Sequence, residues 1–244
     1  MESSPLSGKT VFVSGAARRV GKILALACAQ AGADVIIHYR HSEKEAKATR
    51  EEILSLGRRA WLLSADFNDA VKAFNLMEQV QKISPLYALV NSAAIFETLS
   101  FDTTSLEDWR RHLAINLTAP FLLSQAFVRQ IPQGGDGRIV NILDWRALRP
   151  GTDHFPYTIT KAALAAMTRS LAIALAPNIT VNGLALGAVL PPADGWVNPE
   201  IIKTIPSGRW GQPKELEEAL IFLLTGPAYI TGEIIHVDGG RHLV

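Results

Sequence analysis

Tyr157 and Lys161 lie four residues apart in a segment with helical periodicity, so both side chains emerge from one face of the predicted helix. An ammonium group beside a phenol favours the phenolate and lowers the pKa of the tyrosine, which makes the phenol a tunable proton donor. Thirteen residues before Tyr157, Asp144 ends an apolar segment and supplies a carboxyl group where the chain leaves a predicted strand. The three residues together indicate acid–base machinery for the reduction of a polar double bond.

A glycine-containing turn follows the first predicted strand and runs directly into a helix, with the sequence Ser14-Gly15-Ala16-Ala17-Arg18-Arg19-Val20-Gly21. Glycine lets backbone N–H groups approach a pyrophosphate at a helix N-terminus, where the helix dipole also favours an anion. A tight strand–helix turn without any ligand would look the same. Its place after the first strand of a βαβ series favours a nucleotide.

The end of the second predicted strand bears on the choice of nucleotide. NAD-binding folds usually place an acidic residue there, which holds the ribose 2′-hydroxyl. This chain has His38-Tyr39-Arg40-His41-Ser42 instead. Without a carboxylate, and with Arg40 and either Arg18 or Arg19 nearby, the pocket suits a 2′-phosphate, although a solvated basic turn is the alternative. We therefore expect NADPH rather than NADH.

An alternation of short β-branched segments with longer helical ones must position these residues. It predicts an α/β fold, a doubly wound (Rossmann), mostly seven-stranded parallel sheet with helices on both faces. The predicted strands span residues 10–14, 34–39, 60–64, 88–91, 138–143, 179–184 and 233–236, and the predicted helices 20–31, 43–56, 68–83, 106–130, 157–176 and 214–224. No linker interrupts the pattern, so we expect a single domain over 1–244. The segment 187–211, rich in Pro and Gly, is a predicted substrate loop.

Composition excludes several other classes of protein. A chain of 244 residues with 48% hydrophobic residues can bury a substantial core, and a net charge of +1 argues against a surface for nucleic acid or anionic membrane. The single cysteine, Cys28, excludes an internal disulfide framework, and the six histidines show no metal-ligand spacing. With neither a signal peptide nor an apolar run of about 20 residues, we expect a cytoplasmic protein that spans no membrane.

The motifs, in their order along nearly the whole chain, resemble those of the short-chain dehydrogenase/reductase family. Ser14 and Arg19 replace the threonine and the middle glycine of the family's turn, and Leu186 replaces a proline. The resemblance implies that Asp66 contacts adenine and that Asn116 holds a water for proton relay. Three alternatives stay open. Asp66 could cap the helix that begins near Asn68, Asn116 could hydrogen-bond to buried backbone groups, and Asp144 could only brace a turn.

By the same resemblance, catalysis falls to Asn116, Asp144, Tyr157 and Lys161. The implied NADP(H)-binding residues are Gly15, Arg18, Arg19, Val20, Gly21, Tyr39, Arg40, His41, Ser42, Asp66, Phe67, Asn91, Ser92, Ala93, Lys161, Gly187 and Val189. Relatives form tetramers through the helices that correspond to 106–130 and 157–176, so we expect a homotetramer.

Two departures from the family pattern narrow the expected substrate. Asp144 stands where most members carry serine, and the Arg-Arg-Val-Gly turn is a minority form; both occur in the pteridine, dihydromonapterin and dihydrofolate reductases, which this chain resembles. Those enzymes also carry an aromatic residue at the position of Phe96, which would sandwich a flat pterin against the nicotinamide, with core packing as the competing interpretation.

The resemblance thus implies an NADPH-dependent reductase of a pteridine contacted by Arg19, Phe96, Asp144 and Tyr157. Asp144 would either keep a raised pKa and donate a proton, or be ionised and accept hydrogen bonds. The alternatives are an NADPH-dependent carbonyl reductase acting on 3-oxoacyl thioesters or small ketones, and a catalytically idle NADP-binding regulatory protein.

Overall fold

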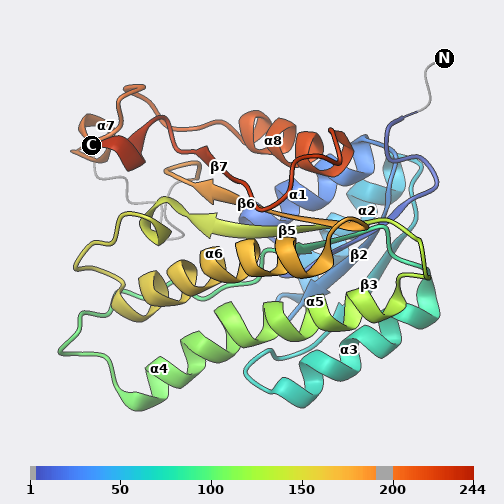
Figure 1. Cartoon of the computed structure of the whole chain (residues 1–244), viewed down its shortest axis with the longest axis horizontal. Coiled ribbons are helices and arrows are strands. Elements are labelled where there is room, and N and C mark those ends of the chain that lie inside the picture. The colour runs from blue at the N-terminus through green and yellow to red at the C-terminus, as the bar shows by residue number, and fades with distance from the viewer. Residues whose placement is uncertain (1–3, 191–199) are drawn as a thin grey trace.

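Seven parallel strands form one sheet in the order β3-β2-β1-β4-β5-β6-β7, which confirms the predicted doubly wound fold (Figure 1). The computed structural model describes residues 4–190 and 200–244. The strands are β1 (Thr10–Val13), β2 (Asp34–Tyr39), β3 (Ala60–Ser64), β4 (Ala88–Asn91), β5 (Gly137–Asp144), β6 (Ile179–Leu186) and β7 (Ile234–Val237).

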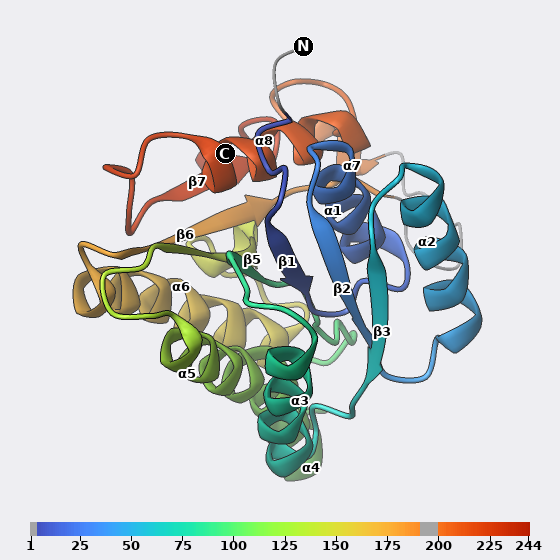
Figure 2. The same ribbon diagram turned by 90° about the vertical axis from the view of Figure 1, so that its right-hand side faces the viewer.

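Helices cover both faces of the sheet (Figure 2). In β1, Val11 and Val13 pack into the core on one face and Phe12 into the core on the other, because successive side chains of a strand point to opposite sides. The first face carries α1 (Arg19–Gln30), α2 (Glu43–Ser55) and α8 (Pro213–Thr225). The second carries α3 (Ala70–Ile83), α5 (Ala119–Gln130) and α6 (Phe155–Leu175).

The predicted helix 106–130 contains an interruption. It consists of α4 (Leu106–Leu113), a π turn at Ala114–Thr118 and α5. All other predicted helix and strand ends lie within two residues of the observed ends. The predicted substrate loop contains a short helix, α7 (Glu200–Lys203), while residues 191–199 of that loop lie outside the described residues.

Helix α6 is apolar enough, by length and composition alone, to cross a membrane, which the sequence analysis did not anticipate. In the structure Leu164, Ala165 and Ala172 of this helix are buried in the core, and the helix packs along β5 and β6. We therefore describe α6 as a core helix of the sheet, and it carries Tyr157 and Lys161 at its first turns.

The order of the strands places a cleft at the carboxyl ends of the central strands. The chain continues from β1 to β2 and β3 on one side, and from β4 to β7 on the other. The loops after β1 and β4 therefore diverge at the carboxyl ends of the strands, which is where doubly wound folds bind ligands.

Candidate active site and cofactor cleft

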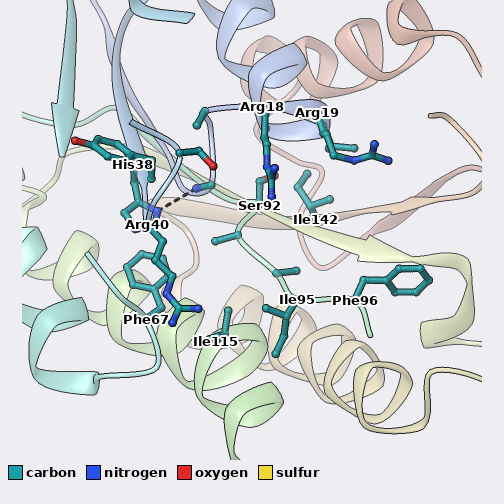
Figure 3. Close-up of a pocket in the computed structure, with 18 of the residues that line it drawn as sticks. Arg18, Arg19, His38, Arg40, Phe67, Ser92, Ile95, Phe96, Ile115 and Ile142 are labelled. Carbon is teal, nitrogen blue, oxygen red and sulfur yellow. Dashed lines mark hydrogen bonds between the residues drawn. The ribbon is translucent and has the colours of Figure 1, made fainter. Parts of the chain in front are cut away.

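A cavity of about 570 Å³ runs along the carboxyl edge of the sheet. It is lined by the segments that follow β1, β2, β3 and β4, by the ends of β5 and β6, and by Tyr157 and Lys161 of α6. Figure 3 shows Arg40 and Phe67 on one side of this cavity and Phe96 on the other, with Arg18 and Arg19 reaching in from the start of α1. Predicted residues from distant parts of the sequence thus share one elongated cleft.

The glycine turn after β1 is packed against the end of β4. Gly15 has a φ of +67°, and a Cβ there would lie 2.8 Å from the Cα of Ala93. A Cβ on Gly21 would collide with the carbonyl oxygen of Gly15. The hydroxyl of Ser14 accepts hydrogen bonds from the backbone N–H groups of Ser92 at 2.9 Å and Ala93 at 3.0 Å. Gly15 therefore lets the turn lie against the β4 loop, and Gly21 lets the first turn of α1 lie against Gly15.

At the opposite end of the cleft from Phe96, Arg40 forms an ion pair with Asp66 at 2.8 Å. Asp66 also accepts the backbone N–H of Asn68, but the cap of α3 is Asp69, whose carboxylate accepts two N–H groups of the first turn. The interpretation of Asp66 as the helix cap is therefore wrong. The Arg40 side chain is 43% exposed, so it remains accessible to a 2′-phosphate, which would compete with Asp66 for the guanidinium.

The hydroxyl of Tyr157 donates a hydrogen bond to Asp144 Oδ2 at 3.2 Å. The other carboxylate oxygen of Asp144 accepts the backbone N–H of Arg146 at 2.9 Å and caps the short 3₁₀ helix Trp145–Ala147. Asp144 therefore braces a turn and contacts the tyrosine at the same time. The turn-bracing interpretation is therefore confirmed, and the catalytic role of Asp144 stays a prediction.

Arg146 places a positive charge next to Asp144, and this residue was not among those predicted for the site. Its Nη1 lies 3.7 Å from Asp144 Oδ1, and its Nη2 donates to Asp153 at 2.7 Å. The two ion pairs connect the end of β5 to the segment just before α6. The only signal in the sequence is an arginine two residues after the aspartate that ends the strand. That spacing does not indicate an ion pair, because the pair with Asp153 forms only when the loop between Arg146 and Asp153 is folded.

The expected lowering of the tyrosine pKa by Lys161 is wrong for this structure. Burial, followed by the negative charge of Asp144 and the hydrogen bond to it, raises the pKa of Tyr157 well above its ordinary value. Lys161 donates instead to the carbonyl oxygen of Ile142 at 2.6 Å. Burial lowers the pKa of Lys161 to about 8, and Asp144 opposes that shift. The phenol is thus held protonated and pointing at a carboxylate.

Two predicted site residues do not line the cavity. Asn91 is 2% exposed, and its amide donates to Asn141 at 2.8 Å beneath the sheet edge. Asn116 lies in the π turn, accepts the N–H of Ile95 at 2.9 Å and donates to the carbonyl of Ile95 at 3.0 Å. The side chain of Asn116 therefore satisfies buried backbone, and Asn91 supports the cleft from inside the core.

Phe96 is 53% exposed, so the core-packing interpretation of this residue is wrong. Its ring stacks on His154 with centroids 3.8 Å apart and meets the edge of Tyr157 at 4.6 Å. His154 in turn lies 2.8 Å from the carbonyl oxygen of Glu97 through its Nδ1. Phe96, backed by His154, therefore gives the cleft a flat aromatic wall next to Tyr157.

The sequence matches a known protein family over nearly its whole length. A short-chain dehydrogenase/reductase family model, described as enoyl-(acyl carrier protein) reductase, matches residues 15–242. The chain belongs to this family. The family includes the 3-oxoacyl-[acyl-carrier-protein] reductase of Synechocystis sp., which is 34% identical over 96% of this chain and 97% of its own length. A second relative, the 3-oxoacyl-[acyl-carrier-protein] reductase FabG of Aquifex aeolicus, is 36% identical over 96% of this chain and 98% of its own length.

Among solved structures, FolM alternative dihydrofolate reductase 1 of Brucella canis, complexed with NADP, has a TM-score of 0.90. It is 33% identical, and the match covers 98% of this chain and 96% of that one. The cleft fits the same dinucleotide, because the glycine turn lines it and leads directly into the N-terminus of α1, and Arg40 is placed for a 2′-phosphate. This agrees with the predicted NADP(H) cofactor.

Proposed function

We propose that this protein is an NADP(H)-dependent reductase whose substrate is a pteridine of the dihydropterin or dihydrofolate type. The observation that carries the proposal is the Asp144–Tyr157 pair in the cleft. A short-chain reductase acting on a ketone generally polarises the carbonyl oxygen with a serine hydroxyl, and this chain has a carboxylate at that position. A pteridine instead presents ring N–H and amino groups, which a carboxylate can accept.

The residues can perform the reduction of a C=N bond in a simple way. When bound, NADPH would supply a hydride to the ring carbon. The ring nitrogen then needs one proton, which the Tyr157 hydroxyl can donate from its position beside Asp144. Asp144 would hold the substrate's N–H groups, and Phe96, backed by His154, would provide a stacking surface for the flat ring.

A second candidate is a carbonyl reductase acting on 3-oxoacyl thioesters or small ketones. Similarity alone favours this candidate, because two curated relatives that span nearly the whole chain are 3-oxoacyl-[acyl-carrier-protein] reductases. The geometry speaks against it, since a ketone oxygen develops negative charge as it is reduced and Asp144 would lie close to that charge. A catalytically idle NADP-binding protein is less well supported, because Tyr157 and Lys161 are both present and line the cleft.

An acceptor panel separates these candidates. We would follow the loss of NADPH at 340 nm with dihydrobiopterin, dihydromonapterin, dihydrofolate and a 3-oxoacyl thioester as separate acceptors. We expect turnover of at least one pteridine. Turnover of the thioester alone would refute the pteridine proposal and leave the carbonyl reductase, and NADPH binding with no turnover of any acceptor would favour the idle protein.

The variant Asp144→Ser makes the test specific to the residue. It restores the hydroxyl that most of the family carries, so we expect loss of pteridine turnover and no loss of NADPH affinity. Unchanged pteridine turnover in this variant would remove the chemical basis of the proposal while the general reductase remained.

A further inference from the structure

His38 is buried beneath the cofactor cleft and connects two of the loops that form it. It belongs to β2 and is 3% exposed. Its Nδ1 accepts a hydrogen bond from the N–H of Gly15 at 3.0 Å (Figure 3), and its Nε2 lies 3.1 Å from the carbonyl oxygen of Ala65. Gly15 follows β1 and Ala65 follows β3, so one imidazole ring bridges the loops on both sides of β2.

The two partners determine the protonation of the ring. A backbone N–H only donates, so Nδ1 must carry no proton; a backbone carbonyl only accepts, so Nε2 must carry one. Burial lowers the pKa of His38 to about 4, against opposing effects of the Ala65 hydrogen bond and of the nearby negative charge of Asp66. The ring is therefore neutral at physiological pH and has a single tautomer.

Further contacts tie His38 to both functional parts of the cleft. Its own carbonyl oxygen accepts the N–H of Ala16 at 2.8 Å, so two successive N–H groups of the glycine turn are bonded to this one residue. Its ring stacks on Phe67 at 4.0 Å with an interplanar angle of 10°. Phe67 lines the cleft beside Asp66 and Arg40, where the adenosine of NADP(H) would bind.

We propose that His38 is a positioning residue for NADP(H), which sets the spacing between the pyrophosphate-binding turn and the adenosine-binding wall. It acts through the backbone of Gly15 and through Phe67, and the chemistry at Tyr157 does not involve it. A dinucleotide has to contact the turn and the wall at the same time. A change in their spacing therefore weakens its binding, whereas a ligand that contacts the wall alone is little affected.

Two variants of His38 test this role. His38→Phe keeps an aromatic ring against Phe67 but leaves the Gly15 N–H without its acceptor, whereas the amide oxygen of His38→Asn can occupy the position of Nδ1 and accept that N–H. We expect His38→Phe to raise the Kd of NADP⁺ by about tenfold, with the Kd of 2′-AMP, which lacks the pyrophosphate, within about twofold of the wild type. We expect His38→Asn to recover NADP⁺ affinity to within about threefold of the wild type.

The matched control is His112→Phe, which replaces another buried histidine, in α4 and outside the cleft. It should cost thermal stability without changing the Kd of NADP⁺. Wild-type affinity for NADP⁺ in His38→Phe would overturn the proposal. Equal weakening of NADP⁺ and 2′-AMP, or a His38→Asn variant as weak as His38→Phe, would also overturn it and leave His38 with a general structural role.

A measurement on the wild-type protein keeps the proposal testable if His38→Phe does not fold. Imidazole ¹⁵N chemical shifts at neutral pH, with NADP⁺ bound, should show the neutral tautomer with the proton on Nε2. A protonated Nδ1 in that complex would exclude the hydrogen bond from Gly15 and overturn the proposal.

Discussion

At the scale of single residues, Asp144 changes how Tyr157 can act as an acid. Burial and, after it, the carboxylate raise the pKa of the phenol, whereas the positive charge of Arg146 lowers it. A tyrosine with a raised pKa remains protonated throughout the physiological range, so its proton is available, but it is a weaker acid than an ordinary phenol. In the reductive direction, activity is lost as the pH rises through the pKa of this group.

The variant Asp144→Asn removes the negative charge and retains an acceptor for the Tyr157 hydroxyl. We expect the pKa of Tyr157 to fall relative to the wild type, so that the alkaline limb of the pH–rate profile moves to lower pH. Pteridine turnover at neutral pH should fall by about 100-fold, because the carboxylate no longer accepts the substrate's N–H groups. Ultraviolet difference titration of phenolate formation, with Tyr157→Phe as the blank, measures the shift; an unchanged titration curve would contradict it.

Arg40 is the residue that we expect to distinguish NADPH from NADH. Replacing it by alanine removes the charge that would bind the 2′-phosphate and leaves Asp66 without its ion-pair partner. We expect Arg40→Ala to raise the KM for NADPH by tenfold or more, because a hydrogen bond between charged groups contributes about 1.5–3 kcal/mol. The KM for NADH should remain nearly unchanged. Steady-state kinetics with both cofactors measures the ratio, and an equal loss for the two would mean that Arg40 does not bind the 2′-phosphate.

Residue types and spacing predicted that Tyr157, Lys161 and most of the other residues of the cleft would lie together. They could not predict the electrostatics, because the pKa of Tyr157 depends on burial and on Asp144 rather than on the lysine one helical turn away. The roles of Asn91 and His38 were hidden for a similar reason. Their hydrogen-bond partners, Asn141 for one and Gly15 with Ala65 for the other, are far away in the sequence.

At the scale of elements, short β-branched segments and helical periodicity placed nearly every boundary within two residues. The π turn at Ala114–Thr118 could not be predicted, because its residues are ordinary helix residues and the extra residue in the turn leaves the apolar pattern readable on both sides. The turn has a function, since it carries Asn116, whose amide holds the backbone of Ile95 in the loop that presents Phe96.

Asn116→Ala should uncouple that loop from the helix. We expect a loss of about 2 kcal/mol in the free energy of unfolding, because the N–H and C=O groups of Ile95 lose their partners, measured by urea denaturation. The KM for the acceptor should rise more than the KM for NADPH, since Phe96 lies at the substrate end of the cleft. The control Ser105→Ala removes the capping box of α4 at a cost of about 1 kcal/mol and should leave both KM values unchanged.

At the scale of the whole molecule, α5 and α6 expose apolar side chains away from the sheet. Phe121 of α5 is 43% exposed and Ile173 of α6 is 82% exposed. We propose that these two helices form an interface between copies of the chain in a homotetramer, since exposed apolar groups on neighbouring helices favour association.

Light scattering coupled to size-exclusion chromatography tests the assembly. We expect a mass of four chains for the wild type and a smaller mass for Phe121→Glu or Ile173→Glu, because a buried unpaired carboxylate destabilises an interface. Leu54→Glu, on the exposed side of α2, is the control and should retain the wild-type mass. A monomeric wild type would contradict the proposal.

The π turn also limits how this gene can change. A π turn contains about one residue more than the α-helical turn that it replaces, so α4 is rotated by about 100° relative to α5. Deletion of a single codon between Ala114 and Thr118 would restore a regular helix and turn Asn116 away from Ile95. Tyr157, Lys161 and the glycine turn would all remain in place. Loss of one triplet, with no substitution anywhere, would then leave a chain that still binds the dinucleotide but no longer holds the loop that presents Phe96.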